Sequence, residues 1–248
     1  MKRAGNLIAR IADPDNLRLA FLKAAKGKRA HACVSVFAAQ LNEQTASLRN
    51  EIICGTPDVG HYTFFTIHDP KKRVICAASF RERVLHHAVM NVCEPVFEAY
   101  QFHDSYACRV GKGTHAALRR AGFFARRYAW YLKMDIRKYF DSIDHETLRH
   151  LLTRRFKDTK VLAIFSRVIE SYATAHGKGV PIGNLLSQHW ANFYLGLFDH
   201  WVKETLRVNG YVRYMDDFIL WHNEQGSTLP ANGQRRDWHG IFFHLSSS

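Results

Sequence analysis

The sequence lacks most of the features that mark secreted, membrane-spanning or zinc-ribbon proteins. Its five cysteines are odd in number, widely spaced and without a Cys-x-x-Cys pair, so neither a disulfide framework nor a zinc ribbon is expected. No apolar run reaches the roughly 18 residues that a membrane span requires. The basic start, residues 1–6, is not followed by the apolar core of a signal peptide. We therefore expect a cytoplasmic protein without a membrane partner.

Acidic residues are scarce relative to basic ones. The chain has 35 Lys and Arg against 22 Asp and Glu, a formal net charge of +13. Such an excess favours a polyanionic partner, nucleic acid or anionic lipid, without choosing between them. One basic run is most often a solvated face, but several spread along the first two-thirds of the chain suggest a long groove. These runs lie at residues 23–29, 71–73, 119–120, 126–127 and 154–160.

With 248 residues, 47% of them hydrophobic, the chain is long enough for one or two domains with a sizeable core. Apolar residues at helical spacing predict helices, the first capped by Asp15 and the second kinked or ended at Pro95. The helices are predicted at residues 16–26, 81–100, 114–127, 145–156, 161–172 and 187–208. Short apolar runs predict strands at 62–67, 74–77, 131–136, 211–214 and 218–221, with a turn at 69–72.

Three aspartates border the predicted strands. Asp135 ends one strand, and Asp216 and Asp217 lie between two others that read as a hairpin with the acids at its tip. Acids beside buried strands are costly unless something compensates their charge. Mg²⁺ binds one or two carboxylates together with phosphate oxygens and waters, and a pair of such ions supports phosphoryl transfer. On spacing alone, a polar turn and a strand end explain these acids at least as well.

Several strings resemble the motifs of reverse transcriptases, in that family's order. Tyr214-Met215-Asp216-Asp217 resembles the YxDD box, and residues 134–143 look like the first palm motif. Residues 179–188, which begin Gly-Val-Pro-Ile-Gly, look like the loop-to-helix motif between them. Residues 72–75 and 104–113 resemble blocks of the fingers. The resemblance covers about residues 62–221, and the ordered set is much more specific than any one motif.

The resemblance implies an α+β fold, the fingers and palm of a right-hand polymerase. The palm would be an antiparallel sheet with helices packed on one side. Along the chain we expect an N-terminal helical extension (1–60), fingers (61–130) and a palm with the catalytic motifs (131–222), so that the reverse transcriptase domain spans about 61–222. An unrelated or disordered tail (223–248) would follow.

The resemblance also implies a metal site. Asp135, Asp216 and Asp217 would be the catalytic carboxylates. Asp135 and Asp216 would hold two Mg²⁺ ions, for which Mn²⁺ could substitute, and Asp217 would support the site as the second acid of the box. The main-chain carbonyl of Ile136 would complete a metal shell.

Four further residues are expected to contact the nucleotide. Phe140 matches the aromatic steric gate that crowds a ribose 2′-OH and so favours dNTPs. Arg73 matches a fingers arginine that holds the triphosphate, although a surface turn residue is the alternative. Ile182, with Gly183 beside it, would lie over the base and sugar. An apolar side chain there cannot replace the hydrogen bonds of a glutamine, which predicts low fidelity.

The implied activity is RNA-directed DNA polymerase: RNA-templated DNA synthesis from dNTPs. Most reverse transcriptases carry Gln-Gly and Ser-Pro where this chain has Ile182-Gly183 and Ser187-Gln188. That variant resembles the error-prone enzymes of bacterial diversity-generating retroelements. A retron, group II intron or phage-defence enzyme is the alternative. The implied partners are a template RNA, a DNA or RNA primer and a small basic accessory protein, in a bacterial or phage-encoded system.

The resemblance stops after Trp221-His222. No primer-grip segment and no helical thumb is recognisable in residues 223–248. We expect a truncated or frameshifted gene whose last residues are out of frame, with a divergent but genuine C-terminus as the alternative. A chain without a thumb would hold a duplex poorly. An inactive, nucleic-acid-binding remnant is therefore a competing function.

Overall fold

The computed structural model of the chain describes residues 2–68 and 72–223. The chain divides into two compact units, each assembled from two separate stretches. Unit 1 comprises Met1–Phe97 and Ile143–Gln188, and unit 2 comprises Glu98–Ser142 and His189–Ser248. Helix α10 (Leu185–Tyr194) begins in unit 1 and ends in unit 2.

Unit 1 is mostly helical. Its helices are α1 (Ile8–Ile11), α2 (Pro14–Ala25), α3 (Ala32–Ala39), α4 (Leu41–Cys54), α5 (Phe80–Glu98), α8 (His145–Arg155) and α9 (Thr159–Glu170). Phe156, at the end of α8, lies between Phe97 of α5 and Phe165 of α9, with ring centroids 5.3 Å apart in both pairs. This aromatic cluster joins residues about 60 positions apart in sequence. It explains why the two stretches of unit 1 form one core.

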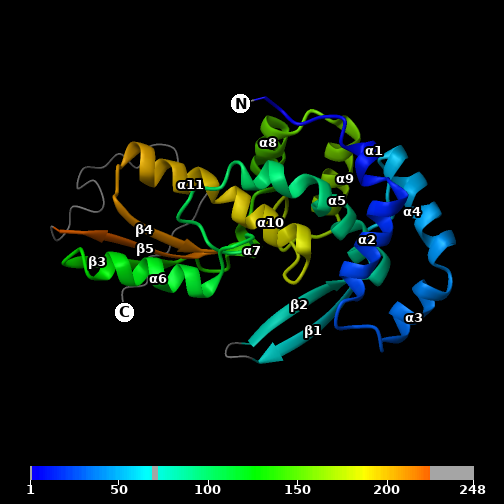
Figure 1. The fold of residues 1–248 in the computed structure, drawn as a ribbon, viewed down its shortest axis with the longest axis horizontal. Helices are drawn as coiled ribbons and strands as arrows, with labels where there is room; N and C mark the ends of the chain where they lie inside the picture. Colours follow the sequence, from blue (N-terminus) through cyan, green and yellow to red (C-terminus); the bar gives the residue numbers. More distant parts are fainter. Residues whose placement is uncertain (1, 69–71, 224–248) are drawn as a thin grey trace. The chain divides into compact units, whose positions relative to one another are not determined.

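A two-stranded hairpin belongs to the same unit. Strands β1 (Tyr62–His68) and β2 (Lys72–Ala78) pair antiparallel, with Phe65 opposite Ile75. The hairpin projects from the helices of unit 1 (Figure 1). It leaves Phe64 58% exposed and Val74 51% exposed. A two-stranded ribbon that projects in this way buries little of its own surface. Its position therefore depends on the segments that pack against the ribbon where it joins the rest of unit 1.

Unit 2 is built around a three-stranded antiparallel sheet in the order β3-β5-β4. The strands are β3 (Trp130–Asp135), β4 (Gly210–Tyr214) and β5 (Asp217–His222). The two faces of β5 contact different helices, because its side chains alternate. Phe218 contacts Phe198 of α11 (Gly196–His200), and Trp221 contacts Phe124 of α6 (Thr114–Ala125). The remaining elements are α7 (Tyr139–Ser142) and the π-helix η1 (Trp201–Thr205).

The structure confirms the α+β prediction and the hairpin of residues 211–221, and it corrects several local predictions. Helices were expected on one side of the palm sheet, whereas α6 and α11 cover opposite faces. Helix α2 starts at Pro14 and is capped by Asp13, not Asp15, because proline fits the first helical position and the Asp13 carboxylate accepts from two following amides. Helix α5 continues through Pro95, so of the two expected outcomes, a kink or an end, the end is excluded.

The prediction of a single long helix over residues 187–208 is wrong. This stretch forms three separate elements, α10, α11 and η1. Gly196, at the first break, lies against the ring of Tyr100, where a Cβ atom would come within 2.6 Å of a ring carbon. Apolar spacing alone does not report such a close approach. The predicted turn at 69–72 falls largely, and the tail at 223–248 almost entirely, outside the described residues.

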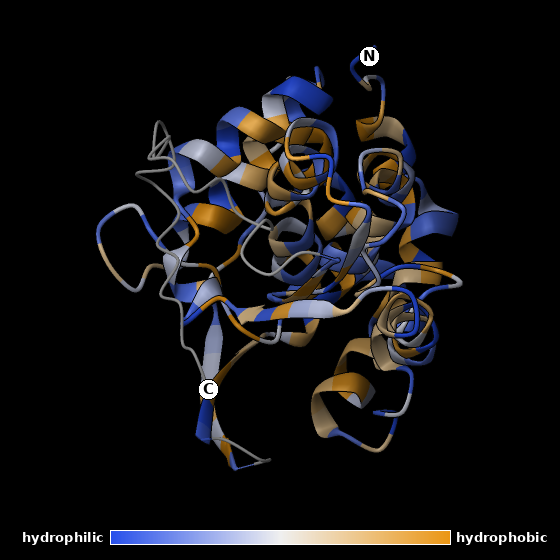
Figure 2. Cartoon of the chain, turned by 90° about the vertical axis from the view of Figure 1, so that its left-hand side faces the viewer, coloured by the Kyte–Doolittle hydropathy of each residue, from blue (hydrophilic) through white to orange (hydrophobic). Residues whose placement is uncertain are grey.

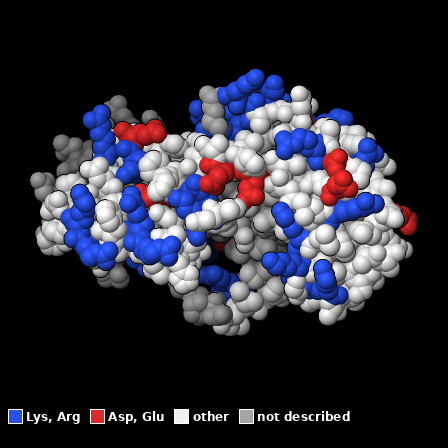
Figure 3. Space-filling model, viewed as in Figure 1, with Lys and Arg blue, Asp and Glu red and all other residues white. Residues whose placement is uncertain are grey.

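The surface agrees with the composition. Polar and apolar residues alternate around the helices, as expected for helices with one buried side (Figure 2). Lys and Arg are spread over the face shown in Figure 3, with fewer Asp and Glu. In the described part of the chain, no helix is both long and apolar enough to cross a membrane.

Candidate active site

The acidic box lies at the turn between β4 and β5. Tyr214 ends β4, Asp217 begins β5, and these two residues are register partners. Met215 and Asp216 form the turn between them. Met215 has a φ of 57°, a left-handed conformation that costs a non-glycine residue free energy unless its surroundings impose it. The turn is therefore held by contacts elsewhere in unit 2.

Asp135 is brought to the same place by the neighbouring strand. The last residue of β3, Asp135, is the register partner of Asp217, the first residue of β5. Directly opposite residues of an antiparallel pair project from the same face, so both carboxylates lie on one face at one end of the sheet. Asp135 and Asp217 are exposed and Asp216 is half-buried. The acids thus face solvent at the end of the sheet. The sequence led us to expect a free-energy cost for desolvating them, and in the structure this cost is small.

The carboxylates of this sheet end are chemically compatible with Mg²⁺. Within residues 2–68 and 72–223, no three His, Cys, Asp or Glu side chains are grouped closely enough to hold an ion by themselves. Mg²⁺ rarely needs such a cage, because it retains waters and takes one or two carboxylates plus substrate phosphates. Asp135 and Asp217, with Asp216 beside them, offer hard carboxylate oxygens that face solvent. Ile136 is buried immediately after Asp135.

Phe140 lies in unit 2 with the acids. It belongs to α7, a single turn that follows β3 after Lys138, whose φ of 52° is also left-handed. The neighbouring Tyr139 is buried, and its hydroxyl donates to the carbonyl of Ala191 at 2.5 Å. Burial raises the pKa of Tyr139 well above its usual value, so the hydroxyl remains a donor. Tyr139 thereby fixes α7 while the Phe140 ring stays half-buried.

A buried charge network, which the sequence analysis missed, lies on the other face of the β4–β5 ribbon. Arg213 of β4 is fully buried. Its guanidinium donates to both carboxylate oxygens of Asp199, at 2.7 and 2.5 Å, to Asn192 and to the carbonyl of Met215. The sequence did contain a sign that Arg213 is buried. Side chains alternate along β4, so Arg213 lies on the same face as Tyr211, which is an inward position.

The expected nucleotide-binding residues other than Phe140 belong to unit 1. Arg73 is exposed on β2. The carbonyl of Ile182 accepts the amide of Cys76 on the same strand at 2.9 Å, and the Asn184 side chain accepts the amide of Ala78 at 3.2 Å. The loop therefore runs along β2, the strand that carries Arg73.

Gly183 is required by that docking. Its φ is 106°, a conformation that L side chains rarely adopt, and an added Cβ would lie 2.8 Å from Cγ2 of Ile75 on β2. Glycine allows the loop backbone to approach the strand closely. The predicted set of site residues thus falls into two groups: Asp135, Ile136, Phe140, Asp216 and Asp217 in unit 2, and Arg73, Ile182 and Gly183 in unit 1.

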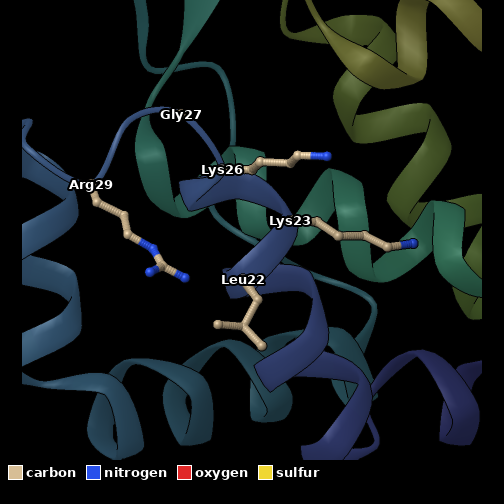
Figure 4. A pocket seen from close by; sticks show the side chains of 5 residues that line it. All are labelled: Leu22, Lys23, Lys26, Gly27 and Arg29. Atoms are coloured by element: carbon tan, nitrogen blue, oxygen red, sulfur yellow. The ribbon is translucent and has the colours of Figure 1, made fainter.

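A surface pocket of about 490 Å³ in unit 1 is a separate feature. It lies at the end of α2 and is lined by Leu22, Lys23, Lys26, Gly27 and Arg29. The cations do not converge on one point: Lys23 and Lys26 extend in one direction and Arg29 in another (Figure 4). The ammonium group of Lys23 donates to Asn91 at 2.6 Å. The pocket contributes basic surface but no catalytic group.

The sequence matches a known protein family over most of its length. Residues 67–234 match the family described as reverse transcriptase (RNA-dependent DNA polymerase). The chain belongs to the reverse transcriptase family. The family match covers the three acids, Phe140 and the loop.

Curated relatives of this reverse transcriptase chain are found in several organisms. Protein YkfC of Escherichia coli (strain K12) is 26% identical over 199 residues, 75% of this chain and 51% of YkfC. The group II intron-encoded protein LtrA of Lactococcus lactis subsp. cremoris is 27% identical over 141 residues, 54% of this chain and 23% of LtrA. Nuclear intron maturase 4, mitochondrial, of Arabidopsis thaliana is 26% identical over 162 residues, 62% and 20% of the two chains. The chain thus spans about half of YkfC and less of the others.

Solved structures share the fold. A telomerase of Candida tropicalis, in its apo form, superposes with a TM-score of 0.51 at 15% identity, covering 76% of this chain and 50% of the telomerase chain. A partial Cas6-RT-Cas1–Cas2 complex gives a TM-score of 0.50 at 22% identity, covering 88% of this chain and 38% of the other. At these identities the similarity establishes the reverse transcriptase fold and nothing finer.

Proposed function

We propose that this chain catalyses RNA-templated DNA synthesis from dNTPs as an RNA-directed DNA polymerase. The observation that carries the proposal is the pairing of Asp135 with Asp217 across neighbouring strands, with Asp216 in the adjoining turn. In the reaction, a primer 3′-OH attacks the α-phosphate of a dNTP and pyrophosphate leaves. Two Mg²⁺ ions, or Mn²⁺, held by Asp135, Asp216, Asp217 and the Ile136 carbonyl, would stabilise charge on the attacking and leaving oxygens.

The remaining predicted residues would position the nucleotide. Phe140 would crowd a ribose 2′-OH, and its neighbour Tyr139 anchors the turn that carries it. Arg73 would hold the triphosphate through its planar fork, and Ile182 and Gly183 would border the base and sugar. The docking of the loop on β2, the strand of Arg73, supports this assignment. Positioning of this kind supplies much of the barrier reduction in phosphoryl transfer.

The partners follow from charge. A net charge of +13 suits a template RNA and a DNA or RNA primer, so affinity should fall steeply as salt rises. We also propose a small basic accessory protein and a cytoplasmic, bacterial or phage-encoded setting. Residues 61–130 would act as fingers and residues 131–222 as palm.

Primer extension on an RNA template with Mg²⁺ tests the activity. The wild-type chain is compared with Asp216→Asn/Asp217→Asn, and with Glu146→Gln as a control that removes an exposed acid of unit 1. Extension by the wild type and the control, but not by the double variant, supports the polymerase. Equal signals from all three proteins would favour a non-catalytic nucleic-acid-binding role.

Error-prone copying is the more specific proposal. Ile182 stands where a glutamine's hydrogen bonds would check nucleotide geometry, so Ile182→Gln is expected to lower misincorporation opposite adenine. An unchanged error rate would remove the argument. A group II intron enzyme is the second candidate, favoured by the similarity to LtrA and to nuclear intron maturase 4. Gene neighbours separate the two: a variable repeat with a template repeat supports the diversity-generating retroelement.

A further inference from the structure

The side chain of Arg213 is enclosed by partners within unit 2. Its Nε and Nη2 donate to Asp199, its Nη1 donates to Asn192 Oδ1 at 2.7 Å, and its Nη2 also reaches the Asn192 carbonyl at 3.2 Å. Asp199 accepts a further hydrogen bond from the Tyr211 hydroxyl at 2.6 Å. Asp199, Asn192 and Arg213 are all almost completely buried. The charges are thus paired and hydrogen-bonded away from water.

The network ends on the catalytic turn. Nη1 of Arg213 donates to the Met215 carbonyl at 2.9 Å. That carbonyl belongs to the residue with the left-handed φ of 57°, and its carbon is bonded to the amide nitrogen of Asp216. A hydrogen bond to this carbonyl fixes the peptide group between Met215 and Asp216. The orientation of that group limits the direction in which the Asp216 side chain leaves its Cα. The buried guanidinium therefore bears on the orientation of an expected metal ligand without touching substrate.

We propose that Arg213, clamped by Asp199 and Asn192, is a positioning residue that holds Met215 in its left-handed conformation and so sets the geometry of the Asp216–Asp217 carboxylates for divalent metal. The proposal rests on the proposed polymerase function for its consequence in catalysis. It makes a separate claim about the metal affinity of the turn, which can be measured without nucleic acid or dNTP.

The arginine keeps its charge in this setting. Burial alone lowers the pKa of the Arg213 guanidinium, but the Asp199 carboxylate raises it by more, so the pKa lies above its usual value. Tyr211 shifts in the same sense, because burial and Asp199 raise its pKa well above normal and keep its hydroxyl a donor. Arg213 and Tyr211 therefore keep their protons throughout the pH range of an enzyme assay.

A role in stability alone and a role in positioning the turn predict different responses to substitution. Replacing a buried ion pair by well-packed apolar residues is often neutral or stabilising, whereas removing one partner is strongly destabilising. A pair kept only to stabilise unit 2 would be replaceable by apolar side chains without effect on metal. A pair that positions the turn would not, because no apolar side chain donates to the Met215 carbonyl.

The test separates those two roles with a charge-neutral double variant. In Arg213→Met/Asp199→Leu both charges are removed, so no buried charge is left unpaired. Arg213→Lys is the conservative companion: it keeps a cation for Asp199, but its single ammonium lacks the planar fork that reaches Asp199, Asn192 and Met215 together. Thermal unfolding checks whether each full-length variant is folded.

Arg109→Met is the matched control. Arg109 belongs to unit 2, pairs with Glu98 through Nε at 2.9 Å and donates to the carbonyls of Phe102 and Ser105. Its loss removes an arginine with a similar set of contacts but none to the acidic turn. The control therefore reports what the loss of such an arginine does to the fold alone.

The main readout is Mn²⁺ affinity, followed by electron paramagnetic resonance without nucleic acid. The expected result is a loss of about tenfold or more in the double variant, the size seen when partners that orient a metal ligand are removed. Arg213→Lys should fall between it and the wild type, and Arg109→Met should bind Mn²⁺ as the wild type does. In primer extension, the Mg²⁺ concentration for half-maximal rate should rise in the same order.

Two results would overturn the proposal: a folded double variant with wild-type Mn²⁺ affinity, or a wild-type chain whose turn binds no Mn²⁺. The proposed function fails in a different way. A wild-type chain that binds Mn²⁺ and extends no primer contradicts the polymerase activity, while the comparison of Mn²⁺ affinities still decides the role of Arg213.

Discussion

The acidic turn of unit 2 and the Gly179–Asn184 loop of unit 1 are both backbone segments in uncommon conformations, held by opposite means. The turn places a side-chain-bearing residue, Met215, at positive φ, and a buried arginine donates to its carbonyl. The loop places Gly179 and Gly183 at positive φ and is held by hydrogen bonds to β2. One segment depends on a side chain being present, and the other on side chains being absent.

This difference determines which substitutions damage each segment. The turn should be sensitive to deletions of functional groups, including those on the opposite face of the sheet. The loop should be sensitive to additions, even of one methyl group, because its backbone lies directly against β2. Four measurements would break or sharpen this contrast.

The largest effect is expected at the acids themselves. Asp216→Asn or Asp135→Asn should lower the primer-extension rate by about a thousandfold or more, because several kcal/mol of charge stabilisation are lost. Unfolding temperatures should change little, since Asp135 is exposed and Asp216 is half-buried. Single-turnover rates and thermal melts measure the two quantities. A variant that retains a tenth of the wild-type rate would contradict the assignment.

The next effect tests the loop by addition. Gly183→Ala should lower the free energy of unfolding by about 2 to 3 kcal/mol, because it adds backbone strain and a contact with Ile75. Gly177→Ala is the matched control: its φ is 67° but an added Cβ meets nothing within 4 Å. It should cost only about 1 kcal/mol, the left-handed penalty alone. Equal losses in denaturant unfolding would show that the loop does not press on β2.

Arg73 tests whether the strand beneath that loop serves the nucleotide. Arg73→Ala should raise the KM for dNTPs by about tenfold, the equivalent of one charge-assisted hydrogen bond of roughly 1.5 kcal/mol. Because Arg73 is exposed, the melting temperature should not move. Arg73→Lys should recover only part of the loss, since a lysine cannot make the paired contacts of a guanidinium. An unchanged KM would assign Arg73 to the surface turn alternative.

The smallest effect is a difference between the units in their response to acid. Burial, helped by Lys23 and other nearby cations, lowers the pKa of His87 in unit 1 to about 4. The folded state therefore favours the neutral ring: its stability is complete above the unfolded pKa of about 6.5 and is lost as pH falls toward 4. Because the ring is only partly buried, solvent screening limits the effect to about 1 kcal/mol.

Hydrogen exchange at pH 7.5 and pH 5 measures this response in each unit separately. Protection should fall in α5 around His87 and stay constant in β4 and β5, where Arg213 remains charged. His87→Asn should remove the pH dependence. A loss of protection that begins in unit 2 would contradict the assignment.

Sequence reasoning found those features whose signal lies within a few consecutive residues. The hairpin of 211–221 was predicted because two apolar strands flank a short acidic turn, and helices α5, α6, α8 and α9 were predicted because their apolar residues recur at helical spacing. The order of the motifs, and not their spacing, distinguished the three aspartates from a polar turn. The cap of α2 was misplaced because Asp13 and Asp15 are both good caps and only Pro14 discriminates between them.

Features that depend on pairing across the chain could not be predicted. Nothing local says that Arg213 pairs with Asp199 or that the carbonyl of Ile182 meets the amide of Cys76. The close approach at Gly196 is to Tyr100, which is nearly a hundred residues earlier. Such contacts set the geometry of the site, whereas local patterns reveal only its ingredients.

The register of Asp135 against Asp217 makes the length of β3 as important as its composition. Side chains alternate along a strand, so deleting one residue between Trp130 and Met134 would turn Asp135 to the opposite face of the sheet. Deleting two residues would restore the face but shift the carboxylate by about 6.6 Å along the strand. β3 should thus accept many single substitutions and no insertion or deletion, an asymmetry that deep mutational scanning with length variants would reveal.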